Sequence, residues 1–331
     1  MLAESGKLGL MNTKTSLARI ALVLALLSGA AQAAPISMNE SALARGFALP
    51  ALGELSIPEP GQYLRQFDLD LVNEFFLGEN ANEQMEVDGE TVRLAWHFLY
   101  GMAPGWNVGV TLPYYIVGGG FMDSSIEGWH RAFGLPNANR EARPHNQINY
   151  NYTRNGQTLL DAHSSGQGIG DLRVEGGHAL TEGLALRAQL KLPTGRTGLL
   201  LGNKAYGGAL WLDYALPFDV ASRFEGYASA GVDYTGKGDV VPELQRNFVP
   251  FGGVGLSCRL FSNLAAEVQW AVHGPLYKNS DMPPLKRLGA PLSFGVNYKF
   301  SPQIELDVLV QEDTSVYASP DFVLHFAVAM H

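Results

Sequence analysis

The chain has 331 residues, of which 46% are hydrophobic, and its 23 Lys and Arg against 32 Asp and Glu give a formal net charge of −9. This acidic balance argues against nucleic acid as a partner. The single cysteine, Cys258, excludes an internal disulfide. After position 33 no apolar run approaches the roughly 18 residues of a spanning helix, which argues against a helical membrane protein.

Residues 1–33 have the features of a cleaved export signal. Lys14 and Arg19 precede the apolar run Ile20–Leu27, and the small residues of 28–33 suit a signal peptidase. Met11 is the more natural start, because a leader that begins there is already complete. We therefore expect a mature chain that begins at Ala34.

Residues 34–61 are rich in Ala, Pro and small apolar residues and lack a clean period. We expect this N-terminal segment to lie on the periplasmic side of the folded domain or inside its lumen. Residues 62–331 are expected to form the domain itself.

From residue 62 onward, apolar and polar residues alternate, as in strands with one apolar face. The clearest case is the hairpin at 168–193, where Leu186 and Leu190 share one face and Arg187 and Lys191 share the other. The pattern predicts about twelve strands, at residues 62–76, 90–100, 106–117, 168–180, 184–193, 204–216, 223–235, 247–260, 264–273, 288–300, 303–311 and 322–330. The acidic stretch 80–88 is expected to be a loop.

The connections between these strands alternate in length. Short turns at 181–183, 217–222, 261–263 and 301–302 alternate with longer loops at 194–203, 236–246, 274–287 and 312–321, a rhythm typical of outer-membrane barrels. Strands can cross lipid only if the sheet has no unpaired edge. The sequence therefore predicts an all-β fold, a closed antiparallel transmembrane barrel with both ends in the periplasm, in the outer membrane of a Gram-negative bacterium.

The long loop 118–167 is the one large interruption, and we expect it on the extracellular side. Residues 122–133 can form a short amphipathic helix with Asp123 or Ser124 as its N-cap. This helix could fold inward and close the lumen, or fold outward and bind a ligand or lipopolysaccharide. Its candidate contact residues are Ile126, Trp129, His130 and Phe133. Residues 146–154 are more strand-like and suggest one arm of a hairpin.

Four motifs resemble an uncharacterised family of Gram-negative envelope barrels, the domain of unknown function DUF3187. They are Arg45–Glu54, Trp129-His130 followed by Phe133–Pro136, Gly168–Leu172 and Lys191–Gly195. The last two also resemble, more weakly, barrels for uptake of aromatic compounds. Residues 38–42 match the usual start of the family only in part, and the chain ends in His331 where such barrels usually end in Phe.

The charged residues of the strands would face the lumen of such a barrel. They either form an ionic network that fills the interior or line a selective path for small polar or zwitterionic solutes. The candidate lumen-lining residues are Asp68, Asp70, Arg93, His97, Asp171, Arg173, Glu175, Arg187, Lys191, Asp213, Glu225, Glu267, Glu305 and Asp307.

The first functional hypothesis is a non-enzymatic barrel that passively transports or binds small molecules, hydrophobic ones included. A non-conducting structural or surface-interaction barrel is the alternative. A membrane-embedded lipid hydrolase using His163 and Ser165 is the third hypothesis. The spacing of the histidines predicts no metal site, and we expect no cofactor. The expected partners are outer-membrane lipid and lipopolysaccharide, and the barrel-assembly machinery during biogenesis.

Overall fold

The computed structural model describes residues 36–53, 56–134, 140, 143–218, 223–315 and 317–331. The predicted export signal at 1–33 lies outside these residues. Within them, no helix has the length and apolar character needed to cross a membrane.

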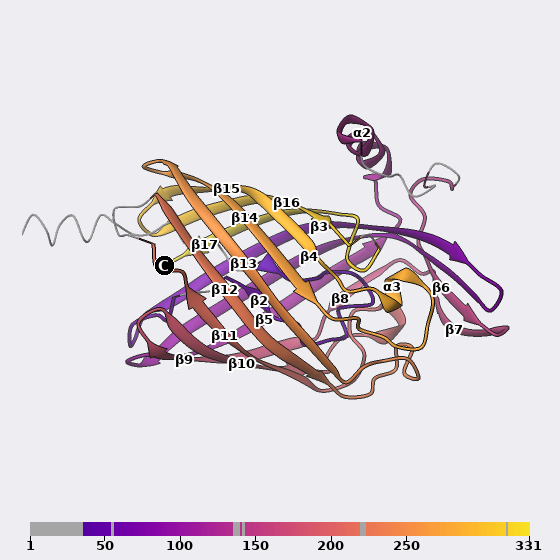
Figure 1. Cartoon of the computed structure of the whole chain (residues 1–331), viewed down its shortest axis with the longest axis horizontal. Coiled ribbons are helices and arrows are strands. Elements are labelled where there is room, and N and C mark those ends of the chain that lie inside the picture. The colour runs from indigo at the N-terminus through magenta and orange to yellow at the C-terminus, as the bar shows by residue number, and fades with distance from the viewer. Residues whose placement is uncertain (1–35, 54–55, 135–139, 141–142, 219–222, 316) are drawn as a thin grey trace, which may run out of the picture.

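Twelve antiparallel strands form a closed barrel (Figure 1), which confirms the predicted fold class. β17 pairs with β3 and so closes the ring, with Phe326 opposite Leu69 at the centre of the closing ladder. The strands are β3 (Tyr63–Glu79), β4 (Glu83–Ala103), β5 (Trp106–Gly118), β9 (Leu172–Thr181), β10 (Leu184–Leu192), β11 (Gly207–Ala215), β12 (Phe224–Thr235), β13 (Phe248–Phe261), β14 (Leu264–His273), β15 (Pro291–Ser301), β16 (Ile304–Asp313) and β17 (Phe322–Met330).

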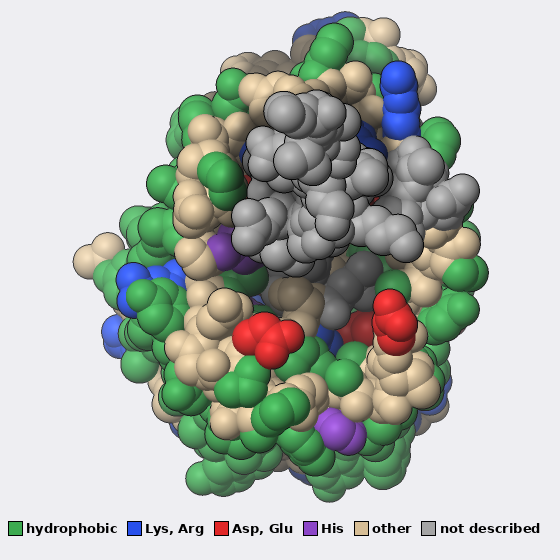
Figure 2. Space-filling model, turned by 90° about the vertical axis from the view of Figure 1, so that its left-hand side faces the viewer, with side chains coloured by type: hydrophobic (Ala, Val, Ile, Leu, Met, Phe, Trp, Pro, Cys, Tyr) green, Lys and Arg blue, Asp and Glu red, His purple; other side chains and the backbone are tan. Residues whose placement is uncertain are grey.

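The two faces of the sheet differ as the alternation predicts. In β10, Arg187 and Gln189 are buried inside the barrel, whereas Leu190 is exposed on its outer wall. Figure 2 views the end that carries the C-terminus, where hydrophobic side chains dominate the perimeter around a central hollow. Cys258 lies half-buried near Leu256, on the outer face of the barrel.

The end of the barrel opposite the C-terminus extends well beyond the ring of strands. The expected acidic loop at 80–88 was wrong, because residues from Glu83 onward belong to β4 and only 80–82 form the turn. Met85 and Val87 continue the alternation and are buried. They pair with β6 (Asn149–Arg154), which forms a hairpin with β7 (Gln157–Ala162) and confirms the strand-like reading of 146–154.

The first arm of the predicted hairpin at 168–193 is interrupted. β8 (Gly166–Ile169) pairs with the C-terminal part of β5, at 114–117, and β9 pairs with its N-terminal part, at 106–111. Between them, the Thr194 hydroxyl donates to the Gly170 carbonyl at 2.6 Å and accepts from the Leu172 amide at 2.9 Å. A side chain thus replaces part of the strand ladder.

Short helices occur only in the long connections of the described chain. α2 (Asp123–Phe133) confirms the helix expected at 122–133, and η2 (Thr197–Leu199) and α3 (Pro283–Lys286) lie in later loops. The expected N-cap was wrong, because Met122 takes that position without a side-chain bond. Asp123 instead accepts hydrogen bonds from Arg140 and from the Asn146 amide, so its carboxylate is already engaged.

The N-terminal residues 36–53, which we call the plug, lie inside the barrel. β1 (Ile36–Ser37) and β2 (Ala51–Leu52) pair with each other and join the two ends of the plug. Every residue from 38 to 50 is buried. Figure 1 shows β2 enclosed by the barrel strands. The lumen is therefore occupied by chain that precedes the first barrel strand.

An apolar core inside the barrel holds the plug on the side of the long loops. Phe47 meets Tyr277 edge-on at 5.6 Å between ring centroids, and Leu52 lies within the same cluster. The other members come from the plug, the strands, the β6–β7 hairpin, the β10–β11 and β12–β13 loops and the loop that contains α3. They include Tyr150, Tyr152, Leu160, Trp211, Tyr227, Val249, Phe251, Leu276, Met282 and Leu285.

Leu210, at the middle of β11 on the outer wall, tests the assignment of that face to lipid. An arginine at the bilayer midplane of a barrel costs about 2–4 kcal/mol. We expect Leu210→Arg to lower the free energy of unfolding by this amount in phospholipid vesicles, measured by urea titration. Leu210→Ala is the control and should cost much less. Equal effects of Arg and Ala would contradict a lipid-facing wall.

Candidate functional site

Four neighbouring strands carry a row of polar side chains that face the lumen. In the strand register, His325 of β17 lies opposite Asp70 of β3, which lies opposite Arg93 of β4, which lies opposite Tyr115 of β5. His325 Nδ1 lies 2.5 Å from Asp70, and Arg93 Nη1 donates to Asp70 at 2.5 Å. Arg93 also lies 3.4 Å from Asp68, so one guanidinium group joins two carboxylates of β3.

The plug adds opposite charges to this wall. Glu40 Oε1 lies 3.3 Å from Arg93 Nε, and Tyr115 donates its hydroxyl to Glu40 at 3.4 Å. Arg45 lies 4.0 Å from Glu74 of β3. All of these side chains are buried. Removal of one partner of a buried ion pair typically lowers the free energy of unfolding by several kcal/mol. Glu40 and Arg45 of the plug are thus each paired with a wall residue of opposite charge.

Other wall side chains bind the backbone of the plug. Arg173 donates to the Leu49 carbonyl at 2.8 Å, and Gln189 donates to the Ala48 carbonyl at 3.1 Å. The Ala48 amide donates to Asp233 at 2.7 Å. Irregular backbone that is buried must find hydrogen-bond partners, and here inward-facing side chains supply them.

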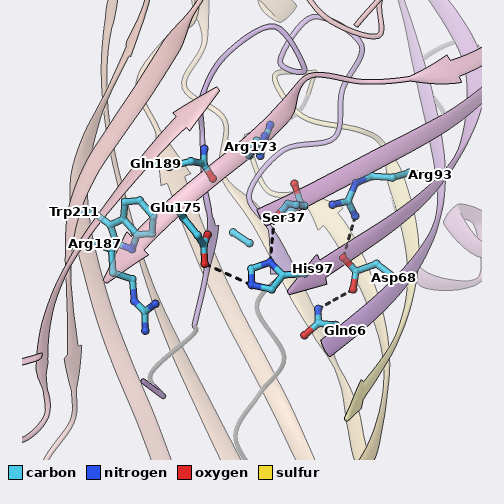
Figure 3. Close-up of a pocket in the computed structure, with 12 residues that line it drawn as sticks. Ser37, Gln66, Asp68, Arg93, His97, Arg173, Glu175, Arg187, Gln189 and Trp211 are labelled. Atoms are coloured by element: carbon cyan, nitrogen blue, oxygen red, sulfur yellow. Dashed lines mark hydrogen bonds and ion pairs between the residues drawn. The ribbon is translucent and has the colours of Figure 1, made fainter. Parts of the chain in front are cut away.

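A small polar cavity remains beside β1 and β2, between the plug and the wall (Figure 3). Its volume is about 30 Å³, which leaves room for about two water molecules. His97, Glu175 and Arg187 line it from three strands, and His97 Nε2 lies 3.5 Å from Glu175. With the plug in place, this space is too small for an organic solute.

The fourteen predicted lumen residues all lie on the inner face. Eleven are buried, and Arg173, Glu175 and Glu225 are half-buried. The structure brings some of them together around the plug, namely Asp68, Asp70, Arg93, His97, Arg173, Glu175 and Arg187. Arg187 also pairs with Asp213 at 2.8 Å, so that most of these charges are neutralised by neighbours.

A second group lies on β14–β16, away from the plug contacts described above. Asn297 donates to Asp307 at 2.9 Å and to Glu305 at 3.1 Å, and Lys299 lies 3.0 Å from Glu305. Glu267 is buried next to Asp307. These contacts favour an ionic network within the wall for this part of the predicted set.

Asp171 and Lys191 form a separate buried pair near the long loops. Lys191 Nζ donates to Asp171 at 2.5 Å, to the Ala205 carbonyl at 2.7 Å and to Asn203 at 3.1 Å. The Gly195 amide donates to Asp171 at 2.8 Å. The two sequence motifs Gly168–Leu172 and Lys191–Gly195 are thus parts of one hydrogen-bonded unit that joins β8, β9 and β10.

The helix α2 lies against the outside of the barrel rather than in the lumen, so its predicted inward alternative was wrong (Figure 1). Trp129 donates its indole N–H to Glu312 at 2.9 Å and packs edge-on against Phe322. Both partners stand on outward positions of β16 and β17. Ile126 and His130 are buried, whereas Phe133 is exposed.

Arg140 fastens this helix to the barrel. It donates to Asp123 at 2.6 Å, to Asn73 at 2.7 Å and to Asp321 at 2.8 Å. Burial raises the pKa of Asp321, which lies in the last long loop, to about 6. Burial, together with the nearby Asp123 carboxylate, likewise raises the pKa of Asp88 to about 7. The Arg140 cluster therefore concentrates acidic groups outside the ring of strands.

Sequence reasoning missed several residues that hold the plug. Glu74, Gln189 and Asp233 stand at inward positions, and the alternation of their strands was the signal that could have placed them in the lumen. Glu40 and Arg45 precede the barrel and belong to no periodic segment. Their pairing with the wall has no sequence signal of its own.

The sequence analysis also considered a catalytic site at His163 and Ser165 and a metal site at the histidines. His163 is exposed and lies 3.3 Å from Asp161, and the described residues show no hydrogen bond between His163 and Ser165. No cluster of three His, Cys, Asp or Glu suited to a metal ion occurs in the part of the chain that the structure describes.

Comparison with solved structures shows which known fold the chain resembles. The COG4313 outer membrane channel from Pseudomonas putida F1 is similar with a TM-score of 0.54 and 11% identity, over 84% of this chain and 98% of that chain. The Ralstonia pickettii toluene transporter TbuX has a TM-score of 0.42 and 9% identity, over 84% and 91%. The chain has the fold of an outer-membrane β-barrel.

Comparison of the sequence then gives its family. Residues 17–331 match the family described as "Protein of unknown function (DUF3187)", and the chain belongs to that family. This confirms the resemblance based on the four motifs. No protein with a curated description matches the chain.

Lys191→Met tests the Asp171–Lys191 pair. It would leave Asp171 buried without its cation, a change that typically costs about 3–5 kcal/mol. We expect a loss of this size in urea unfolding, and a smaller loss for Asp171→Asn with Lys191→Met. The control is Lys204→Met, because Lys204 pairs with Asp239 at the exposed surface, where ion pairs contribute little. Similar losses at both lysines would refute a structural role for the buried pair.

Proposed function

We propose that the protein resides in the outer membrane of a Gram-negative bacterium and passes or binds small molecules through its lumen, with the plug as its gate. The short turns and the C-terminus face the periplasm, and the long loops face outward. The observation that carries the proposal is the filling of the lumen. A separate N-terminal segment occupies it, and polar side chains of the wall contact that segment.

The contacts of the plug suit a removable element. Glu40 meets Arg93 and Arg45 meets Glu74 through side chains alone, and the wall binds the plug carbonyls through Arg173 and Gln189. When the plug leaves, water or a solute can replace these contacts one by one. The wall that remains carries both signs of charge, which suits small polar or zwitterionic solutes.

The alternative function is a non-conducting structural barrel. The complete burial of residues 38–50 and the apolar packing of Phe47 and Leu52 favour it, because withdrawal of the plug exposes apolar surface to water. The cost of that exposure decides between a gate that opens and a core that remains fixed.

Planar bilayer recordings distinguish these functions. We expect the wild-type chain to be closed most of the time, and Glu40→Gln with Arg45→Gln to raise the open probability by about tenfold or more, because two buried ion pairs are lost. The matched control, Lys237→Gln with Glu243→Gln, removes an exposed pair of the same charges. It should behave as wild type.

Absence of conductance from all three proteins, each shown to be folded by its heat-dependent gel mobility, would contradict transport and favour the structural barrel. Conductance that is equally high in all three would contradict the role of the plug as a gate.

A further inference from the structure

Glu40 and three arginines surround Tyr115 where the plug meets the wall. Glu40 accepts from Tyr115 and pairs with Arg93, and the Arg45 guanidinium lies 4.9 Å from the centre of the Tyr115 ring. Arg173 also lies close enough to act electrostatically on the Tyr115 hydroxyl. Arg93 and Arg173 line the same small cavity, from β4 and β9 (Figure 3).

Particular donors at this cluster have no hydrogen-bond acceptor. On the wall, Arg93 Nε is buried and has no hydrogen-bond partner within the described residues, although it faces the Glu40 carboxylate at 3.3 Å. On the plug, the same is true of both terminal nitrogens of Arg45. Arg173 has no carboxylate partner among the described residues and donates to a backbone carbonyl. Buried donors without acceptors are costly, so an anion at this position gains charge-assisted hydrogen bonds.

The carboxylate and its receptor belong to different parts of the molecule. Glu40 belongs to the plug, whereas Arg93, Tyr115 and Arg173 belong to the wall and stay in place when the plug moves. Arginine with a neighbouring hydroxyl is a favourable receptor for a planar carboxylate. The wall groups could therefore accept a carboxylate from a soluble molecule where the plug now supplies its own.

We infer that Arg93, Tyr115 and Arg173 form a binding site for small carboxylates, which Glu40 occupies as an internal ligand while the plug is in place. The inference rests on the proposed function, because it names the class of solute that competes with the plug. A soluble carboxylate that takes the position of Glu40 removes one of the two ion pairs of the plug. Binding of the solute is thereby coupled to opening of the lumen.

Acetate is the probe that fits this site. Replacement of Glu40 by Ala removes one CH2–COO⁻ group, which matches acetate in size and charge. We expect detergent-purified Glu40→Ala to bind acetate at least about tenfold more tightly than wild type, in which Glu40 competes for the same groups. Acetamide has nearly the same shape without the charge and should not bind. Isothermal titration of the full chain measures both.

Two double variants assign the binding to the wall. Glu40→Ala with Arg93→Gln should lose acetate binding. Because that change also leaves Asp68 and Asp70 without their shared cation, Glu40→Ala with Tyr115→Phe provides a second, milder test. It keeps every charge and should weaken acetate binding several-fold, in line with the loss of one hydrogen bond to a charged group.

The results separate this inference from the proposed function. Acetate binding to Glu40→Ala without conductance from any variant would keep the carboxylate site and refute transport. Conductance together with no acetate binding, with equal binding of acetamide, or with binding unchanged in the Tyr115→Phe double variant would refute the carboxylate site and leave transport standing.

Discussion

The structure depends on one constraint, which is that every backbone N–H and C=O in hydrocarbon must pair with another strand. The ladder between β17 and β3 satisfies it, because it removes the last free edges of the sheet. Closure also fixes the direction of each side chain. With a period of two, the apolar residues face lipid and the charged ones face inward, where they must find partners.

The same need for partners explains the interior. The plug is mostly irregular, so its carbonyls and amides require donors and acceptors that a strand would supply to a neighbour. Arg173, Gln189 and Asp233 supply them from the wall. The mixed charge of the inner face is therefore matched to the chain that fills it. In the function that we propose, polar groups of a solute take the place of those of the plug on this wall.

The interior is divided between fixed and exchangeable contacts. The pairs Asp171–Lys191 and Arg187–Asp213 join neighbouring strands and strengthen the wall itself. The contacts of Glu40 and Arg45 join the wall to a segment outside the barrel sequence. Both groups contain buried ion pairs, but only the second can separate while the strand ladder stays intact.

Much of the fold could be predicted from the sequence because its signal is local. The alternation of Leu186 and Leu190 with Arg187 and Lys191 sets both a strand and its faces, and the alternating turn lengths are typical of an outer-membrane barrel. The position of the plug has no such signal. Asn39 bonds to His273, 234 residues away, and such a contact is invisible in the local pattern.

At the long loops, too, the sequence predicted local structure better than contacts between distant residues. The alternation in residues 83–88 was present, but the density of acids there resembled a loop. The helix α2 was identified from its own spacing, whereas its position outside the barrel depends on Glu312 and Phe322, far along the chain. The residues that line the lumen were thus predictable as a face, and their partners in the plug were not.

The most direct measurement of the position of the plug is a disulfide between Ala48→Cys and Gly207→Cys in a Cys258→Ser background. A Cβ at Gly207 would lie 3.1 Å from the Ala48 Cβ, near enough for a disulfide after a small adjustment. The structure predicts that this pair forms a cross-link in the assembled protein, seen as loss of free thiols. Ala48→Cys with Gly208→Cys, whose second site faces outward, should not. Free thiols in the first pair, or equal cross-linking in both, would contradict a plug inside the barrel.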